Sequence, residues 1–226
     1  RKDSKELKNF LDQWVKIPDN IDRMDVLHDK YWLSSPYFAM RRVRIPKGAI
    51  SPYDYLFKKF AKEIAWDWKL LAAVAYHESK FDSTQVSWAG AMGIMQLMPR
   101  TAASFVLNRR TVFNPEKNIE AGVQYIKSLN LTFGRIEDKE ERIKFILAAY
   151  NSGPAHIIDA MALAEKYGKN PYIWFNNVEY YVEKKGEPQY YNDPVVKYGR
   201  FRGKVTIGYV IKTLDTYHRY SGKFIR

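Results

Sequence analysis

The chain has 226 residues, of which 46% are hydrophobic, enough for one domain with a buried core and a small appendage. It contains no cysteine, which excludes disulfides, zinc–thiolate sites and cysteine nucleophiles, and no run of about 20 apolar residues, the length that spans a bilayer. The formal net charge of +12 fits a polyanionic partner, either nucleic acid or a carboxylate-rich cell wall, or a basic surface without a single partner. Since the sequence has no RNA-binding aromatic signature and no zinc-finger spacing, a nucleic-acid partner is not expected.

Residues 1–48 are predicted to form a short helical N-terminal segment. Apolar residues recur at helical spacing at Leu7, Phe10, Leu11, Trp14 and Val15. Pro18-Asp19-Asn20 break this pattern, and residues 21–32 resume it less regularly. The stretch from Ser34 to Gly48, with its prolines and clustered arginines, is typical of a linker, so a domain boundary is expected near residue 49. Any export signal or lipid anchor is expected upstream of Arg1.

Residues 49–226 carry regular helical signals and weak strand-like alternation, which predicts a mainly α domain. N-caps are expected at Ser51, Asp67 and Asp138, and Glu141 would complete a capping box with Asp138. Helices are further expected over residues 68–79, from Pro99, after Asn114-Pro115, on both sides of Gly153-Pro154, and over residues 204–220.

Glu78 is the candidate catalytic residue. On its predicted helix it lies four residues after Val74 and seven after Leu71, which places it on the apolar face. The helix C-terminus and the apolar surroundings both disfavour the ionised carboxylate, so its pKa should be raised. A carboxyl group that stays protonated near neutral pH suits general acid catalysis on a glycosidic oxygen. Taken alone, however, this segment favours an ordinary, partly exposed glutamate at a helix end.

Three motifs change that interpretation. They are Glu78-Ser79-Lys80-Phe81, the run Gly90-Ala91-Met92-Gly93-Ile94-Met95-Gln96-Leu97-Met98-Pro99 after Ser87, and Ala149-Tyr150-Asn151-Ser152-Gly153. In this order they resemble the catalytic domain of the soluble lytic transglycosylase family, with a likeness extending over about residues 49–220. Residues 53–75 and Tyr190-Tyr191-Asn192-Asp193-Pro194 are similar to the membrane-bound lytic transglycosylase F branch in particular.

The resemblance implies a lysozyme-like helical domain with a glycan-binding groove. It implies cleavage of the MurNAc–GlcNAc bond of peptidoglycan with formation of a 1,6-anhydro ring, with Glu78 acting first as acid and then as base. Substrate contacts carried over from the family motifs fall on Ser87, Gln96, Tyr150, Asn151 and Met95, although packing explains Asn151 and Met95 equally well. No cofactor or metal is implied.

The branch also implies a periplasmic location, with any attachment to the outer membrane made only through an upstream anchor or module. Residues 1–48 would be the tail of an upstream solute-binding-like module plus a linker, and residues 49–226 the catalytic domain. A private extension of the catalytic domain is the alternative for residues 1–48.

One position departs from the family pattern. Val205 stands where the family often has a glutamate that faces the groove, and Glu179, Glu183 or Glu187 is a candidate replacement in space.

Two other functions remain open. One is a hydrolytic lysozyme-like enzyme using Asp82 to activate water, although Asp82 is also a candidate cap for the next turn. The other is an inactive peptidoglycan-binding domain.

Overall fold

A computed structural model describes residues 5–16, 43–108 and 110–222. Contacts divide the chain into two units, residues 1–44 and 45–226, a division slightly ahead of the expected boundary at residue 49. In the first unit the predicted helix is present as α1, Lys5–Lys16, with Leu7 and Phe10 exposed. The expected continuation over residues 21–32 and most of the linker lie outside the described residues.

The second unit is helical, as predicted, and its described residues contain only isolated β-bridges, Val86 with Met92 and Met92 with Leu97. Its longer helices are α5 (Trp68–Ser79), α7 (Pro115–Thr132), α8 (Lys139–Ser152), α9 (Pro154–Lys166) and α12 (Lys204–Tyr220). Shorter ones are α4 (Asp54–Phe60), the 3₁₀ turn η2 (Ala61–Ile64), α6 (Pro99–Ser104), the irregular turn η3 (Trp174–Val178), α10 (Glu179–Lys184) and α11 (Pro188–Tyr191).

Most predicted helix ends are confirmed because local side chains satisfy the free backbone groups there. Asp67 accepts from the Lys69 N–H, and Asn114 accepts from the Lys117 N–H. Asp138 accepts from the N–H groups of Glu140 and Glu141. Gly153, at φ 83°, separates α8 from α9.

Two predicted caps differ from expectation. Ser51 Oγ accepts from the Tyr53 N–H at 3.0 Å, as a cap does, but helix α4 itself begins later, at Asp54. The Asp54 carboxylate accepts from the N–H groups of Ile50 and Ser51, so it folds back and holds the entry turn. Glu141 does not complete a capping box, because its carboxylate accepts from Lys144 and from the N–H of Trp174 instead.

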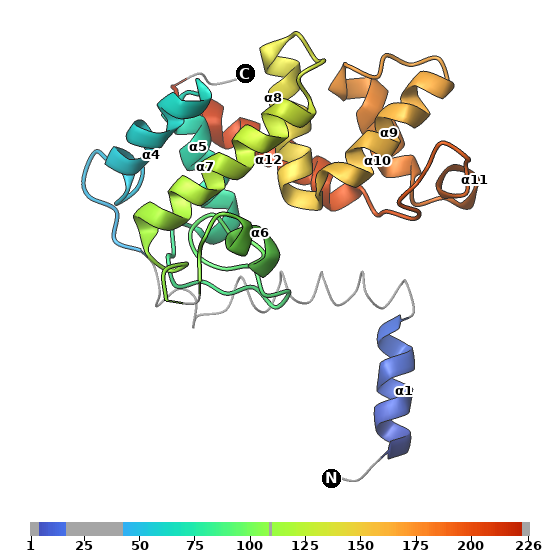
Figure 1. Ribbon diagram of the computed structural model, residues 1–226, viewed down its shortest axis with the longest axis horizontal. Coiled ribbons are helices and arrows are strands. Elements are labelled where there is room, and N and C mark those ends of the chain that lie inside the picture. The colour runs from blue at the N-terminus through green and yellow to red at the C-terminus, as the bar shows by residue number, and fades with distance from the viewer. Residues whose placement is uncertain (1–4, 17–42, 109, 223–226) are drawn as a thin grey trace. The chain divides into compact units, whose positions relative to one another are not determined.

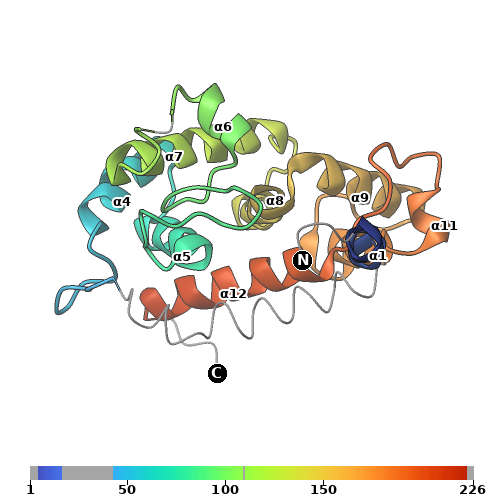
Figure 2. The same ribbon diagram turned by 90° about the horizontal axis from the view of Figure 1, so that it is seen from below.

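Helix α12 packs against the two helices, α5 and α8, whose C-terminal ends carry Glu78 and Tyr150. Figure 2 shows it running beneath both of them. Helices α9 and α10 pack together and, with α11, form one end of the unit (Figure 1). The core is apolar and includes Leu71, Phe145 and Trp174, each fully buried. No helix in the described part of the chain has the length and apolar character needed to cross a membrane.

Candidate active site

Glu78 lies in the last turn of α5, where the chain changes direction. The middle of this helix is fixed by the apolar run from Leu70 to Ala75, all of it buried. Directly after the helix, Lys80 and Phe81 adopt left-handed φ values of 54° and 67°. This turn leads the chain away from the helix axis, so that Glu78 keeps contact with solvent at the end of a buried helix.

The pKa of Glu78 is raised to about 7, mainly because burial disfavours its charge. Two groups act in the opposite direction: the hydroxyl of Tyr209, which donates to Oε1 at 2.6 Å, and the positive charge of Lys80. At neutral pH the carboxyl is therefore divided between its acid and base forms. That balance is what a group needs to donate a proton and then take one back.

Tyr209, on α12, is the partner of Glu78 that the sequence analysis missed. Its side chain is buried, and burial together with the neighbouring Glu78 charge raises its pKa well above the usual value. It therefore remains a neutral hydrogen-bond donor at any physiological pH. The sequence carries a signal for it, because the family pattern in which Val205 replaces glutamate, Gly-x-Glu-Thr-x-x-Tyr-Val, continues to Tyr209 and Val210.

Ser87 and Gln96 lie on the loop between α5 and α6, and both are partly exposed. Ser87 Oγ accepts from the Ala91 N–H at 2.9 Å, which leaves its hydroxyl proton to be donated elsewhere. The side-chain nitrogen of Gln96 donates to the carbonyl oxygens of Gln85 and Gly93. The backbone bonds of the loop thus orient both side chains before any ligand arrives.

Asn118, on α7, holds this loop through hydrogen bonds to its backbone. It is another residue that the sequence analysis missed. It is fully buried; its oxygen accepts from the Met95 N–H, and its nitrogen donates to the carbonyls of Met92 and Val112. Gly93 lies against it, where an added Cβ would come within 2.5 Å of Asn118 Nδ2. The burial of Asn118 could not be predicted from the sequence, because a single asparagine within an amphipathic helix resembles a surface residue.

Met95 is a core residue, and the structure gives no support to its side chain as a substrate contact. The side chain is fully buried and packs against Gly122 of α7. Only its backbone oxygen reaches toward the site, where it accepts from the Tyr150 hydroxyl at 2.7 Å. Its place in the motif therefore reflects packing between the loop and α7.

Tyr150 and Asn151 lie in the last turn of α8. Burial raises the pKa of Tyr150 well above its usual value, and the Glu78 charge nearby adds to this shift. Its ring lies 5.3 Å from that of Tyr125. Asn151 is exposed, and its Oδ1 accepts from the Thr206 hydroxyl at 2.8 Å, which ties the end of α8 to the first turns of α12.

Several predicted alternatives are also placed by the structure. Asp82 accepts from the backbone N–H and the hydroxyl of Thr84, so it caps its own turn. Val205 is exposed at the start of α12, and of the three candidate replacements Glu183 lies 3.7 Å from the Nζ atom of Lys204, the residue before Val205. His77 bonds to Thr216, and burial lowers its pKa to about 4. Among the described residues no group of three acidic or histidine side chains is arranged to hold a metal ion.

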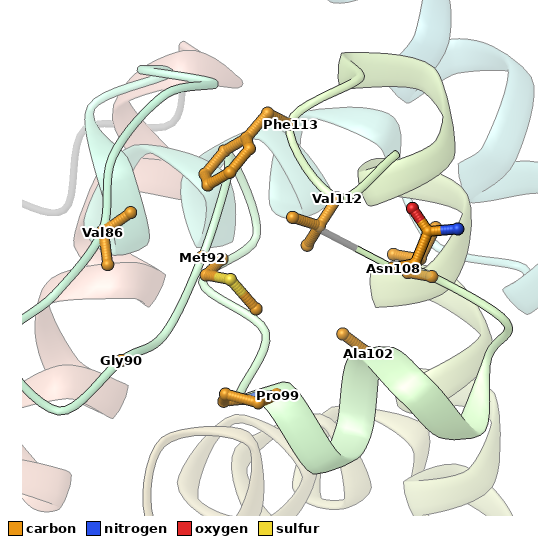
Figure 3. Close-up of a pocket in the computed structure, with 9 residues that line it drawn as sticks. Val86, Gly90, Met92, Pro99, Ala102, Asn108, Val112 and Phe113 are labelled. Carbon is orange, nitrogen blue, oxygen red and sulfur yellow. The ribbon is translucent and has the colours of Figure 1, made fainter. Parts of the chain in front are cut away.

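A pocket of about 470 Å³ borders the same loop but does not include Glu78. Figure 3 shows Val86 and Met92 facing Val112, Asn108 and Ala102 across it. Its lining is apolar except for Asn108, whose Oδ1 already accepts from the N–H groups of Arg110 and Thr111. Glu78, where the titratable group lies, is therefore a better candidate for the chemistry than this pocket.

The transglycosylase SLT domain family matches residues 55–173, more than half of the chain, and the chain belongs to this family. It is similar to the protein named membrane-bound lytic murein transglycosylase F from Haemophilus influenzae, with 35% identity over 95% of this chain and 45% of that protein. A protein of the same name from Citrobacter koseri is 39% identical over 74% of this chain and 31% of its own length. The chain thus spans less than half the length of these relatives.

The fold is also that of a solved structure, the 70 kDa soluble lytic transglycosylase from Escherichia coli, with a TM-score of 0.51. The similarity covers 75% of this chain and 24% of that one, at 24% identity. It confirms the predicted lysozyme-like helical fold. The match to the family ends before α12, so Tyr209 lies outside it.

Proposed function

We propose that this chain is a peptidoglycan lytic transglycosylase with Glu78 as its single acid–base catalyst. The observation that carries the proposal is the pairing of Glu78, with a pKa of about 7, and Tyr209, a neutral donor 2.6 Å from it. Membership of the SLT domain family and the names of the relatives, which specify murein, support peptidoglycan as the substrate.

In the first step, the protonated Glu78 gives its proton to the glycosidic oxygen as the bond from C1 of MurNAc to that oxygen breaks. The C6 hydroxyl of the same MurNAc then bonds to C1, and its proton passes to the Glu78 carboxylate. The carboxyl ends as it began, and no water is consumed. Because the nucleophile belongs to the substrate, no second carboxylate is needed.

In this proposal the Tyr209 hydroxyl stabilises Glu78 during its ionised interval, since hydrogen bonds to charged groups are the stronger ones. Ser87 donates its hydroxyl proton to the bound glycan, and Gln96 offers its amide oxygen, because its nitrogen is used within the loop. Tyr150 and Asn151 form the wall contributed by α8, with Tyr150 holding the loop through Met95.

The test is to incubate the protein with purified peptidoglycan and to identify the released muropeptides by mass spectrometry, with Glu78→Gln as the control. Anhydro-ended products, one water lighter than hydrolysis products and absent with the variant, are expected. Reducing-ended products would instead assign the protein to the hydrolytic class and implicate a second group such as Asp82. Binding without products would identify a peptidoglycan-binding domain.

We further propose that the chain acts in the periplasm and that residues 1–48 are the end of an upstream solute-binding-like module and its linker. The match to the Haemophilus influenzae relative supports this, because coverage of 95% of the chain extends into those residues. Any attachment to the outer membrane would be made through that upstream part. Deletion of residues 1–48 is expected to leave the unfolding midpoint of the remaining domain unchanged; a large fall would mean that they belong to the catalytic domain.

A further inference from the structure

Helix α12 turns a polar face toward the core. Its buried residues are Thr206, Tyr209, Val210, Thr213 and Thr216. Their spacings of three and four residues place them on one face of the helix, and α12 packs along α5 and α8. All of them except the valine carry a hydroxyl group into the interior, where a hydroxyl group needs a hydrogen-bond partner.

One of these hydroxyl groups differs from the rest. The others have partners on α5 or α8, and the pairs are Thr206 with Asn151, Tyr209 with Glu78, and Thr216 with His77. Thr213 is fully buried, yet its Oγ1 makes no aligned hydrogen bond with any described residue. A buried hydroxyl group without a partner destabilises a fold, so its presence in the core calls for an explanation.

The group to which Thr213 can bond is the hydroxyl of Tyr209. The two residues are four positions apart, so their side chains lie one turn apart on the same face of α12. Burial and the charge of Glu78 raise the pKa of Tyr209, and a hydrogen bond from Thr213 acts in the opposite direction. Thr213 is therefore within reach of Tyr209, although the two hydroxyl groups are not aligned in this structure.

The proposed reaction takes Glu78 through two protonation states, which require different things of Tyr209. An ionised Glu78 accepts the Tyr209 proton, as the distance of 2.6 Å between the two oxygens allows. A protonated Glu78 has a proton of its own to donate. When it donates to the Tyr209 oxygen, the Tyr209 proton needs another acceptor. Thr213 Oγ1 is an acceptor within reach, and in the ionised state its own proton can go to the Tyr209 oxygen.

We propose that Thr213 is a positioning residue that gives the Tyr209 hydroxyl a second hydrogen-bond partner in both protonation states of Glu78. This rests on the proposed function and adds a third member to the pair at the site. With Glu78 ionised, the bonds run from Thr213 to Tyr209 to Glu78. With Glu78 protonated, they run from Glu78 to Tyr209 to Thr213. The direction reverses by rotation of two hydroxyl groups, and each bond strengthens the next.

The other charged and titratable groups near Glu78 leave a titration in this region easy to interpret. They are Tyr150 on α8, His77 and Lys80 on or just after α5, and Lys212 on α12. Tyr150 and His77 do not titrate near neutral pH, since the pKa of the first is raised well above its usual value and that of the second is lowered to about 4, in both cases mainly by burial. Both lysines remain in every variant, so their effect cancels in the comparison.

The test follows the titration of Glu78 by NMR of protein carrying isotopically labelled glutamate, with Glu78→Gln to assign the signal. Thr213→Val keeps the shape of the side chain and removes the hydroxyl group, whereas Thr213→Ser restores that group. Thr213→Val is also made in a Tyr209→Phe background. Thr216→Val is the matched control, since this buried threonine bonds to His77 instead. The unfolding midpoint and the pH profile of kcat/KM on peptidoglycan are measured for each variant.

Thr213→Val is expected to raise the pKa of Glu78 by about 0.3–1 pH unit, because Tyr209 becomes a weaker donor to the carboxylate. The basic limb of kcat/KM should move up by the same amount, and the unfolding midpoint should not fall, since no aligned bond is lost. Thr213→Ser should restore the wild-type titration, Thr216→Val should not displace it, and Thr213→Val should have no effect in the Tyr209→Phe background.

An unchanged titration in Thr213→Val, a failure of Thr213→Ser to restore it, or an equal displacement in the Tyr209→Phe background would overturn the proposal. The last result would mean that Thr213 acts on Glu78 without Tyr209. If the wild-type protein releases no muropeptides, the proposed function fails, and the NMR titration by itself then decides whether Thr213 acts on Glu78 through Tyr209.

Discussion

The hydroxyl of Tyr209 donates to Oε1 of Glu78 at 2.6 Å, joining α12 to the end of α5 across 131 positions of sequence. This bond opposes the effect of burial on Glu78, because it favours the ionised carboxyl. The pKa of about 7 is thus set by two elements distant in the chain, and several measurements follow from that balance.

Replacing Tyr209 by Phe should raise the pKa of Glu78 further above 7, since the group that lowers it is lost. The proton needed for the first step would then persist to higher pH. We expect the basic limb of kcat/KM to move up by about one pH unit, with activity at the optimum reduced about tenfold or more, in line with a lost bond to a charged group. Tyr150→Phe is the control, because that hydroxyl bonds to Met95. An equal displacement of the limb in both variants would contradict the assignment.

Glu78→Gln should become more stable than the wild type as the pH rises. The folded-state pKa is raised, so the protonated form stabilises the fold fully below the unfolded value near 4.5, and this contribution is lost as the pH passes through about 7. Urea unfolding at several pH values should show the difference growing by up to about 3 kcal/mol between pH 4 and 8. A difference that stays constant across this range would mean that Glu78 titrates normally.

Asp159→Ala should destabilise the protein by about 3–5 kcal/mol, because it leaves Lys185 charged and buried without its partner. The surface pair Lys59–Glu116 offers a control, and Glu116→Ala should cost less than about 1 kcal/mol. The lowered pKa of Asp159 means that its contribution is present above the unfolded pKa and is lost as the pH falls through the folded one. The wild type should therefore lose stability in acid more steeply than the Asp159 variant; parallel profiles would argue against an ionised pair.

Val106→Gly should stabilise the protein by about 0.5–1 kcal/mol. Val106 has a left-handed φ of 62° just after α6, where its N–H and that of Leu107 close the helix end on Ala103 and Ala102. Glycine is the usual residue at this position, and Val106 is 89% exposed, so no packing would be lost. Phe81 has a similar φ but is 1% exposed, and Phe81→Gly should instead cost about 3–5 kcal/mol. Thermal unfolding distinguishes the two, and a less stable Val106 variant would refute the strain argument.

Asn118→Ala should destabilise the protein by about 2–4 kcal/mol, because it leaves the Met95 N–H and the carbonyls of Met92 and Val112 without the hydrogen bonds that Asn118 makes to them in the interior. It should also loosen the loop that carries Ser87 and Gln96, which faster amide exchange over residues 85–97 would report. Asn130→Ala, on a partly exposed face of the same helix, should cost less than about 1 kcal/mol and leave the loop unchanged. Unchanged exchange in the Asn118 variant would mean that the loop is held by other contacts.

The long helices and the candidate catalytic carboxyl could be predicted from the sequence. The ends at Asp67, Asn114, Asp138 and Gly153 were predictable because a cap bonds to groups within about three residues of itself. The raised pKa of Glu78 was predictable in direction, because its spacing from Leu71 and Val74 already places it on a buried face. Prediction from local sequence failed where a group distant in the chain competed for the same side chain. Glu141 accepts from the N–H of Trp174, 33 residues away, instead of closing its own capping box.

Which side chains meet across the core could be seen only in the folded structure. Tyr209 reaches Glu78 only because α12 packs along α5, and Asn118 supports the loop only because α7 lies against it. The motif made Met95 a candidate contact, whereas packing against Gly122 places it in the core. The physical reason is that helix periodicity fixes the face on which a side chain lies, whereas its partner across the core depends on how whole helices pack together, which no local pattern encodes.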